Sequence, residues 1–371
     1  MRTSDPGSKP RCNRWRDELR AAIFSAFNAP LTLEEVADPA CPRDGVVVAV
    51  RACGVCRSDW HAWTGADPDV SAPHVPGHEF SGEVVAVGPD CRRFKPGDRV
   101  TAPFILACGT CPDCLGGDPT VCASQHVVGF SAWGAFAEYL AVPHADFNLV
   151  RIPEALDYVP VAGMGCRVTT AFRGLVDRAR LLPGEWLAVH GCGGVGLSAV
   201  MIGAALGASI VAVDVNDEAL ALAAQLGATR TLNAGGLGDV GGAVRDITGG
   251  GAHVSIDALG ITETFHNSLA SLRKLGRHVQ IGMPLGRHAT PTVPLLEMVY
   301  SRQITIMGTR GIAASRFPSL FEMIAAGRID PGRLVTRTIP LAGAGAALAA
   351  MNSYGQTGIT VIDMNKQANR E

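Results

Sequence analysis

The sequence lacks an excess of charge of either sign. Its 371 residues contain 32 Lys and Arg against 34 Asp and Glu, which gives a net charge of −2. This balance provides no basic field that could hold a nucleic acid. Charged residues make up only 18% of the chain. We therefore expect a small, uncharged molecule as the partner of this protein.

The sequence also lacks long hydrophobic runs. No apolar stretch approaches the length of about 18 residues that crosses a bilayer, because Gly and charged residues interrupt each one. The first twenty residues contain no apolar segment of the kind that a secretory signal requires. They carry six cations, at Arg2, Lys9, Arg11, Arg14, Arg16 and Arg20. We expect a cytoplasmic protein with no membrane span and a loosely ordered extension over residues 1–20.

Cysteine, in contrast, is abundant, with 11 residues. A reducing compartment does not sustain a disulfide framework, so metal binding and buried thiols are the expected uses. Four cysteines lie within fifteen residues of one another, at Cys108, Cys111, Cys114 and Cys122. This spacing favours a tetrahedral zinc ion held by thiolates, since it seldom satisfies disulfide geometry. A redox-labile cluster is the alternative.

The pattern along the chain predicts two domains of an α/β protein. From Gly45 to about Val150 the apolar segments are short, β-branched and interrupted by Gly and Pro, which indicates an antiparallel or barrel-like sheet. After Leu182 short apolar strands alternate with Ala-rich helices, which is typical of a parallel sheet covered on both faces. We expect a flexible surface loop at residues 235–242. After Arg310 the pattern predicts helix, strand, helix and strand.

A glycine-rich turn follows the first of these parallel strands. The segment HGCGGVGLSAV places Gly191, Gly193 and Gly196 between an apolar strand and an apolar helix, which is the context of a dinucleotide-binding turn. There the first glycine makes the turn, the second admits the pyrophosphate and the third lets the helix pack on the strand. A purely structural turn is the alternative.

An acidic residue, Asp214, ends the next predicted strand, 23 residues after Gly191. A carboxylate at this place accepts hydrogen bonds from the adenosine ribose and repels the 2′-phosphate of NADP. The next two residues, Val215 and Asn216, offer no arginine that would offset this repulsion. The sequence therefore favours NAD as the cofactor. A role of Asp214 in capping the next helix is the alternative.

A second set of metal-binding residues is scattered over three segments. Cys56 and His78 lie in predicted loops of the first domain, and Cys166 lies just before the parallel-sheet region. Two thiolates and one imidazole leave the fourth position of a zinc ion open for a water or a substrate oxygen. Such an ion acts as a Lewis acid. Buried thiols and an ordinary histidine are the alternative.

Over roughly residues 21–365 the chain resembles the zinc-dependent alcohol dehydrogenases of the medium-chain dehydrogenase/reductase superfamily. The resemblance rests on CGVCRSDWH, GHE, CGTCPDCLGGDPTVC, GCRVTTAF, GCGGVG and the strand-end Asp214. It implies a GroES-like, barrel-type catalytic domain and a Rossmann domain with a doubly wound parallel sheet. The catalytic domain would span residues 21–166, with a metal-binding lobe at 104–125, the Rossmann domain 167–308, and the returning part of the catalytic domain 309–371.

The resemblance also implies two zinc ions in each subunit. Cys56, His78 and Cys166 would bind the catalytic ion, and the four clustered cysteines a structural ion. Asp59 resembles the group that orients the zinc-bound imidazole, and Glu79 the carboxylate near the metal that assists ligand exchange.

Further positions match family residues at the reaction site. Ser58 resembles the hydroxyl that accepts the alcohol proton, and His61 the outer end of the proton relay to solvent. Arg57 matches a contact to the pyrophosphate of NAD, whereas Thr170 and Val195 match residues beside the nicotinamide ring.

One departure from the family concerns a cofactor contact. Where relatives often have Gly-Arg before the last strand, this chain has Gly358 and Ile359. A phosphate contact is therefore expected to be missing or replaced.

The implied activity is the reversible oxidation of primary or secondary alcohols to aldehydes or ketones, with hydride transfer to nicotinamide C4. Polyol-oxidising relatives commonly have a carboxylate at the position of Cys166, which favours simple alcohols here. A polyol or glutathione-adduct dehydrogenase is the alternative among enzymes, and a noncatalytic NAD-binding protein is an alternative of a different class.

Two further expectations concern the substrate pocket and the assembly. Trp60, Trp63, Phe130 and Trp133 are candidates for an apolar pocket wall, with core packing as the alternative. The short interval between Cys122 and Cys166 resembles that of the tetrameric branch of the family, which implies a homotetramer.

Overall fold

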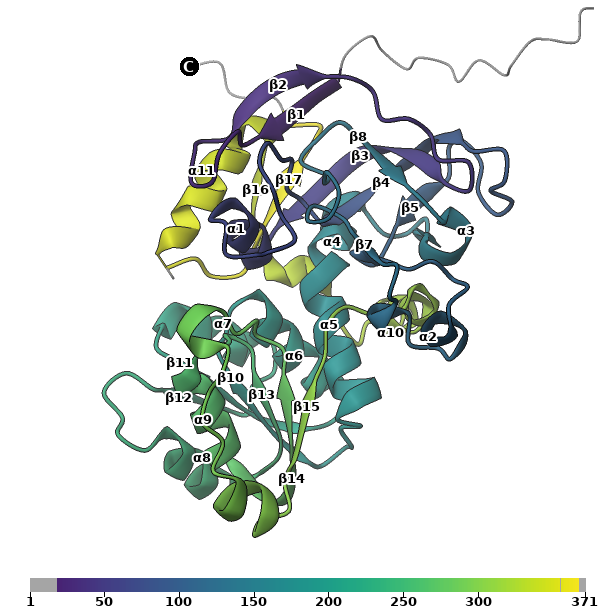
Figure 1. The fold of residues 1–371 in the computed structure, drawn as a ribbon. Helices are drawn as coiled ribbons and strands as arrows, with labels where there is room; N and C mark the ends of the chain where they lie inside the picture. Colours follow the sequence, from purple (N-terminus) through teal and green to yellow (C-terminus); the bar gives the residue numbers. More distant parts are fainter. Residues whose placement is uncertain (1–18, 354, 367–371) are drawn as a thin grey trace, which may run out of the picture.

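The computed structural model describes residues 19–353 and 355–366. Of the extension predicted over residues 1–20, positions 1–18 lie outside the described residues, and Leu19 and Arg20 begin a strand instead. Figure 1 shows an upper part built around one twisted sheet and a lower part built around another. No helix in the described ranges is long and apolar enough to cross a membrane.

The upper part contains a seven-stranded sheet in the order β16-β17-β3-β4-β5-β9, with β8 also paired to β3. All its strand pairs are antiparallel except β16 with β17. Its strands are β3 (Val46–Val55), β4 (Glu79–Val87), β5 (Arg99–Thr101), β8 (Tyr139–Val142), β9 (Val150–Arg151), β16 (Val335–Ile339) and β17 (Ile359–Asp363).

Smaller elements surround this sheet. Two additional hairpin-like pairs join β1 to β2 and β6 to β7. These elements are β1 (Leu19–Ile23), β2 (Thr32–Val36), β6 (Ile105–Leu106), β7 (His126–Val127), α1 (Arg57–Trp63), α2 (Pro112–Leu115), η1 (Pro119–Val121) and α3 (Ala145–Asn148). The β-branched residues of β3 explain its place at the centre, because nine of its ten residues are buried.

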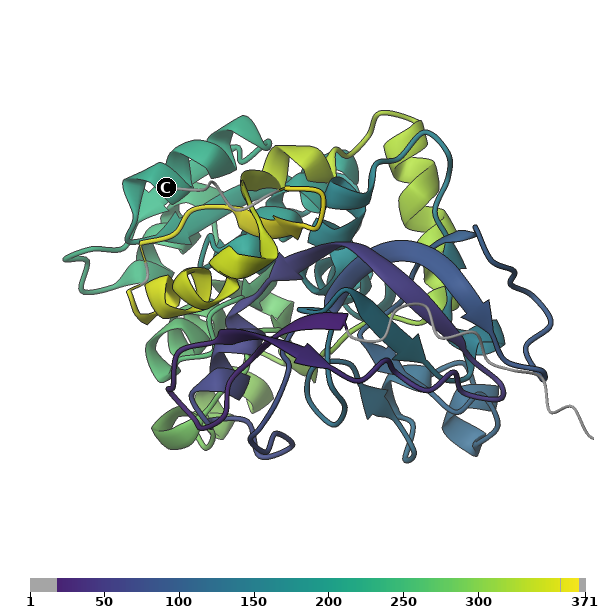
Figure 2. The ribbon, with the colours of Figure 1, turned by 90° about the horizontal axis from the view of Figure 1, so that it is seen from above.

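The end of the described chain lies beside its beginning. β17 pairs with β3 in the register Thr360↔Val55, and Figure 2 shows the last helices and strands next to the first ones. The tail contains α10 (Phe317–Ala325), η7 (Pro331–Leu334), η8 (Leu341–Gly343), α11 (Ala344–Ala349) and η9 (Ala350–Asn352). The tail therefore completes the first sheet after the chain has passed through the lower part.

The lower part is a six-stranded, entirely parallel sheet in the order β12-β11-β10-β13-β14-β15. The strands are β10 (Trp186–His190), β11 (Ser209–Asp214), β12 (Arg230–Asn233), β13 (Ala252–Asp257), β14 (Leu272–Gln280) and β15 (Thr305–Gly308). The order reverses between β10 and β13, which is the doubly wound arrangement whose ligands bind at the reversal. The predicted α/β fold class is confirmed.

Helices connect consecutive strands on both faces of this sheet. α6 (Gly194–Ala205) and α7 (Asp217–Gln225) pack on β11, whereas α8 (Val240–Thr248) and α9 (Thr262–Ala270) pack on β13. The predicted loop at residues 235–242 is only partly a loop, since α8 already begins at Val240 with Asp239 capping Gly242. Short helical turns complete the lower part at η4 (Gly286–His288), η5 (Leu295–Tyr300) and η6 (Ala314–Arg316).

One long helical segment joins the two parts. It runs without a break through α4 (Tyr158–Gly163), η2 (Met164–Val168), α5 (Thr169–Phe172) and η3 (Arg173–Arg178), of which η2 and η3 have the wide turns of a π-helix. Such turns often occur at functional sites. The boundary proposed between residues 166 and 167 falls inside this segment, and the predicted domain limits stay a prediction.

Candidate functional site

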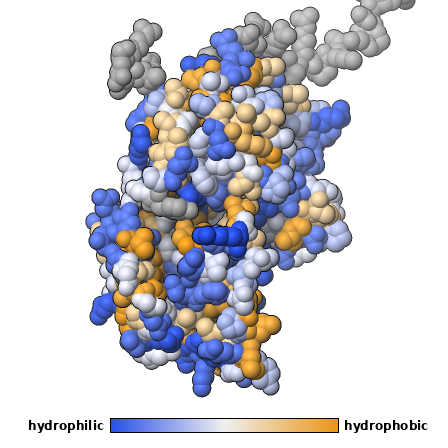
Figure 3. All heavy atoms as spheres, turned by 60° about the vertical axis from the view of Figure 1, so that its left-hand side comes forward, coloured by the Kyte–Doolittle hydropathy of each residue, from blue (hydrophilic) through white to orange (hydrophobic). Residues whose placement is uncertain are grey.

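A cleft with a volume of about 1840 Å³ lies between the two parts of the molecule. Both parts line it: Cys56, His78 and Cys166 lie on one side, and Gly193 and Asp214 on the other. Figure 3 shows the hollow at this waist, with strongly hydrophilic side chains next to hydrophobic ones.

Three of the predicted metal ligands meet in this cleft. Cys56 caps the N-terminus of α1, His78 immediately precedes β4, and Cys166 lies in the π-helical segment η2. Their ligand atoms and a carboxylate oxygen of Glu79 all lie within 4.8 Å of one another. All four side chains are buried. The fold therefore gathers the predicted ligands from three separate segments.

A fully buried carboxylate orients two of these ligands. Asp59 Oδ2 accepts the backbone N–H of Cys56 at 2.8 Å, and Oδ1 accepts Nδ1 of His78 at 2.7 Å and the N–H of Gly77 at 3.0 Å. His78 Nε2 is also buried but has no hydrogen-bond partner among the described residues. An orphaned imidazole nitrogen beside two sulfurs fits a zinc ion, for which this is a common ligand set.

The close approach of these ligands also shifts their protonation. A hydrogen bond from Cys166 lowers the pKa of the Cys56 thiol, while the same contact and burial raise that of Cys166. Burial lowers the pKa of His78, but the charges and hydrogen bonds of Asp59 and Cys56 together raise it by more. The pKa of His78 therefore lies well above its ordinary value. The protonation of these three groups is thus linked, and a metal ion that bound them would displace protons.

Glu79 pairs with a buried arginine that sequence reasoning missed. Arg167 Nε donates to Glu79 Oε1 at 3.1 Å, and Nη2 donates to Oε2. The exposed fractions of the two side chains are 7% and 0%. Burial raises the pKa of Glu79 to about 7, although the guanidinium acts in the opposite direction. In this pair each charged group takes the place of the water that would otherwise solvate the other.

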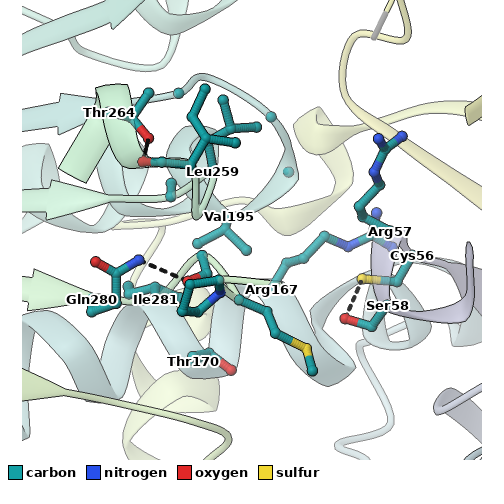
Figure 4. A pocket seen from close by; sticks show the side chains of 18 of the residues that line it. Cys56, Arg57, Ser58, Arg167, Thr170, Val195, Leu259, Thr264, Gln280 and Ile281 are labelled. Carbon is teal, nitrogen blue, oxygen red and sulfur yellow. Dashed lines mark hydrogen bonds between the residues drawn. The ribbon is translucent and has the colours of Figure 1, made fainter. Parts of the chain in front are cut away.

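Glycine makes room for this arginine and for the helix that carries it. A Cβ on Gly194 would lie 2.4 Å from Arg167 Cδ, and a Cβ on Gly165 would lie 2.8 Å from Glu79 Cα. Arg167 thus extends from the metal-ligand set to the glycine-rich turn, and Figure 4 shows it between Arg57 and Thr170.

The glycine-rich turn has the geometry that a dinucleotide needs. Gly191 has a φ of +93°, which favours glycine, and a Cβ on Gly196 would lie 1.8 Å from the carbonyl oxygen of Gly191. Nothing lies within 4 Å of the place where a Cβ on Gly193 would stand. Gly193 precedes the first turn of α6, whose N–H groups face this open space.

Asp214 stands at the end of β11 with its carboxylate held in place. Its Oδ2 accepts the N–H of Cys192 at 2.5 Å, and Oδ1 accepts the N–H groups of Val215 and Asn216. The side chain of Asn216, and not that of Asp214, caps α7. The alternative role of Asp214 as a helix cap is therefore wrong.

The other predicted site residues also line the cleft. Ser58 Oγ lies 3.8 Å from Cys56 Sγ, and His61 Nδ1 is buried without a partner among the described residues. Burial and the charge of Arg57 lower the pKa of His61. Val195 lies on α6 and Thr170 lies on α5. Thr170 Oγ1 accepts a hydrogen bond from the N–H of Gly311.

The position after Gly358 contributes no contact to this cleft. Ile359 is the first residue of β17, is fully buried and packs in a hydrophobic core. Where relatives often have an arginine, this chain thus has a residue of the hydrophobic core.

The predicted aromatic wall is only partly correct. Phe130 lines the cleft, but Trp63 is buried against Ala29, Trp60 bonds Asn352, and Trp133 is 46% exposed. The second ring of the wall is instead Phe104. The rings of Phe104 and Phe130 both contact His78 edge-on, with centroids 5.6 and 5.2 Å from it.

The four clustered cysteines form a second compact group on a lobe of the upper part. Four of their six Sγ–Sγ distances are 3.4–3.9 Å, and all four Sγ atoms lie within 4.8 Å of one another. A tetrahedral zinc with bonds of 2.3 Å would place its sulfurs about 3.8 Å apart, whereas a disulfide joins sulfurs at about 2.05 Å. Hydrogen bonds from the backbone and side chain of Thr110 lower the pKa of Cys108 to about 5. The group therefore suits a metal ion.

A hydrogen-bonded floor for the cofactor side was also missed from the sequence. Asp257, at the end of β13, accepts hydrogen bonds from Thr264 Oγ1 and Gln280 Nε2 and from the N–H groups of Leu259 and Gly260. Leu259, Gly260 and Thr264 follow β13, whereas Gln280 is the last residue of β14. Figure 4 shows Leu259, Thr264 and Gln280 around the same pocket.

Comparison with known proteins assigns the chain to a family. Residues 42–154 match the model of the alcohol dehydrogenase GroES-like domain, and residues 194–326 that of the zinc-binding dehydrogenases. An alcohol dehydrogenase of Geobacillus stearothermophilus is 36% identical over 319 residues, which cover 84% of this chain and 90% of the relative. The chain belongs to the zinc-dependent alcohol dehydrogenases of the medium-chain superfamily.

Solved structures of the family agree with this assignment. The alcohol dehydrogenase of Thermus sp. ATN1 superposes with a TM-score of 0.84 at 31% identity, covering 93% of this chain and 99% of that one. A zinc-binding dehydrogenase of Sinorhizobium meliloti 1021 bound to NADP has a TM-score of 0.83 at 25% identity, covering 94% and 100%. The prediction of a zinc-dependent dehydrogenase that acts on alcohols is confirmed.

The buried pair of Glu79 and Arg167 gives a test of this alcohol dehydrogenase site. Arg167→Met leaves the Glu79 carboxylate buried and uncompensated, which costs about 3–5 kcal/mol of stability. We expect a lower midpoint of thermal unfolding by calorimetry, partly restored in Arg167→Met/Glu79→Gln. The control is Arg151→Met, whose pair with Asp98 is half-exposed and contributes about 1 kcal/mol or less. Equal midpoints of Arg167→Met and Arg151→Met would contradict the interpretation.

Proposed function

We propose that this enzyme reversibly oxidises primary or secondary alcohols to aldehydes or ketones with NAD. The observation that carries the proposal is the meeting, in one cleft, of an orphaned His78 nitrogen beside two cysteine sulfurs with the glycine-rich turn at Gly193. A metal that polarises oxygen and a carrier that accepts hydride are the two requirements of this reaction.

Cys56, His78 and Cys166 would hold the catalytic zinc, which supplies Lewis acidity toward the substrate oxygen, while NAD supplies the hydride-accepting C4 of its nicotinamide. Ser58, beside Cys56, takes the proton of the substrate hydroxyl. His61 receives that proton at the outer end of the relay to solvent. Its lowered pKa keeps the ring neutral near pH 7, and its Nδ1 has no partner among the described residues. Phe104 and Phe130 exclude water from the reacting carbon.

The cofactor would lie across the reversal of strand order. The open space at Gly193 would take the pyrophosphate, with Arg57 as a further contact, and Val195 and Thr170 would pack against the nicotinamide. Asp214 accepts hydrogen bonds from the adenosine ribose, because its carboxylate is already fixed by backbone donors. Glu79 assists exchange of metal ligands from within its pair with Arg167.

The two groups of cysteines predict different effects of losing a metal ligand. Cys56→Ala removes a catalytic ligand, so we expect about half of the zinc to be lost, turnover to be abolished and NADH binding to persist. Cys111→Ala removes a ligand of the lobe, so we expect a similar zinc loss, a lower thermal midpoint and residual turnover. Metal analysis, initial rates and NADH fluorescence measure these effects. Wild-type turnover in Cys56→Ala would refute the catalytic site.

Cofactor preference tests the role of Asp214. In Asp214→Ser the repulsion of a 2′-phosphate disappears, so we expect the ratio of kcat/KM for NAD over NADP to fall by about tenfold or more. The control is Asp217→Ser, since Asp217 does not line the cleft. A wild-type enzyme that prefers NADP would show the assignment of Asp214 to be wrong.

We also propose a homotetramer, on the basis of an exposed apolar surface beside the edge strand β15. Leu295, Leu296 and Tyr300 are all at least 64% exposed there. Apolar side chains exposed together commonly mark protein interfaces.

Light scattering tests this assembly. We expect a particle of four times 38.7 kDa and a smaller one in Leu296→Glu/Tyr300→Glu, because charge would be buried in the interface. Leu115→Glu, which alters an equally exposed leucine on the cysteine lobe, is the control. Dissociation by Leu115→Glu alone would place the interface elsewhere.

A further inference from the structure

Charge is unevenly distributed along the cleft, although the chain as a whole is nearly neutral. At the end next to the cysteine lobe the cleft is lined by three arginines, Arg173, Arg178 and Arg310. Among the residues that line this end, Asp118 lies 3.3 Å from Arg173 and is 67% exposed. The nearby Asp177 also acts on Arg173, but it is paired with Arg316. This end of the cleft therefore carries more positive than negative charge.

Arg310 is the arginine of this group whose charge has no polar partner among the described residues. It follows β15 and is exposed, and its guanidinium makes no ion pair or hydrogen bond within residues 19–353 and 355–366. Arg173 Nη1 donates to the carbonyl oxygen of Arg310, and Arg178 Nε to that of Gly308, so the backbone of the loop is held from below. A fixed loop with an uncompensated cation suits the binding of an anion.

Arg310 also stands one aromatic ring away from the reaction site. Its guanidinium carbon lies 5.9 Å from the centroid of Phe104, and the same ring contacts His78 edge-on. The ring of Phe104 thus forms an apolar surface between the proposed metal ligand His78 and the cation of Arg310.

Unpartnered hydroxyl groups accompany this cation. Thr120 is 6% exposed and its Oγ1 has no hydrogen-bond partner among the described residues, and the same holds for the buried Oγ1 of Thr309, next to Arg310. Both residues line the cleft. Buried hydroxyls are normally hydrogen-bonded, so an orphaned pair points to a polar ligand.

The cofactor phosphates do not account for this set. The turn at Gly193 follows β10, and Arg310 follows β15, with β13 and β14 between them. Three strand spacings amount to about 14 Å. Asp214 ends β11, on the opposite side of β10, so the adenosine half lies still further away. In Figure 1 β15 is the edge strand on the side of α2. The pyrophosphate and the adenosine half are therefore too far away, and a nicotinamide beside Thr170, which bonds the N–H of Gly311, offers no anion to Arg310. The anion that Arg310 binds is thus assigned to the substrate.

We propose that the physiological substrate is an alcohol, or the matching carbonyl compound, that carries an anionic group, and that Arg310 with Thr120 and Thr309 binds this anion. The anion is a carboxylate or a phosphate ester, joined to the reacting carbon by a short apolar chain that lies along Phe104. The inference rests on the proposed alcohol oxidation and replaces the uncharged partner that the composition favours.

Pairs of charged and uncharged substrates with the same reacting alcohol test the proposal with the zinc-loaded enzyme. In the carboxylate arm, 4-hydroxybutanoate is compared with 4-hydroxybutanamide, and in the phosphate arm, 3-hydroxypropyl phosphate with 1,3-propanediol. We expect kcat/KM to favour the anion by about tenfold to a hundredfold in one arm, which identifies the anion. Added salt should reduce this ratio, because the site is open to solvent.

Variants assign the preference to its residue. Arg310→Gln should remove most of the anion preference, and Arg310→Glu should instead favour 4-aminobutanol over 4-hydroxybutanoate. A merely structural role of Arg310 would not invert the charge preference. The control is Arg337→Gln, an exposed arginine on β16 that does not line the cleft, and both rates should stay at the wild-type level.

Failure of this inference differs from failure of the proposed function. If neutral alcohols are oxidised but neither anion is preferred, or if Arg310→Gln keeps the preference, the anion site is refuted and the alcohol oxidation stands. If no substrate of the panel is oxidised with NAD or NADP, the alcohol oxidation itself is refuted.

Discussion

The catalytic side of the cleft depends on one buried carboxylate. Asp59 accepts hydrogen bonds from the backbone of Cys56 and Gly77 and from the ring of His78, so a single group fixes two of the proposed metal ligands, which lie 22 residues apart in the sequence. Burying a charge is costly unless it is hydrogen-bonded, and these three donors offset that cost. With Nδ1 engaged in this way, Nε2 is the nitrogen that remains for a metal.

The parts of the site that lie close together in the sequence could be predicted from it. The glycine-rich turn and the four cysteines each occupy one short segment, and short spacing restricts the geometry almost completely. The parallel strands were equally clear, because β10, β11 and β13 are buried on both faces and read as continuous apolar runs.

Contacts between distant segments could not be predicted in the same way. Arg167 and Glu79 are 88 residues apart, and nothing in either segment indicates the other. Trp60 and Trp63 lie on α1 near Ser58, but their side chains point to other faces of the helix, which sequence proximity does not reveal. β12 was missed because its residues RTLN are mostly exposed and include only one large apolar side chain.

The cysteine lobe has a consequence for what a substrate contacts. Asp118, Thr120 and Val121 lie in the chain between Cys114 and Cys122, and all three line the cleft. The four clustered cysteines thus hold both ends of a segment that forms part of the cleft wall. Substitutions between Cys114 and Cys122 would therefore change what a substrate contacts without altering Cys56, His78 or Cys166.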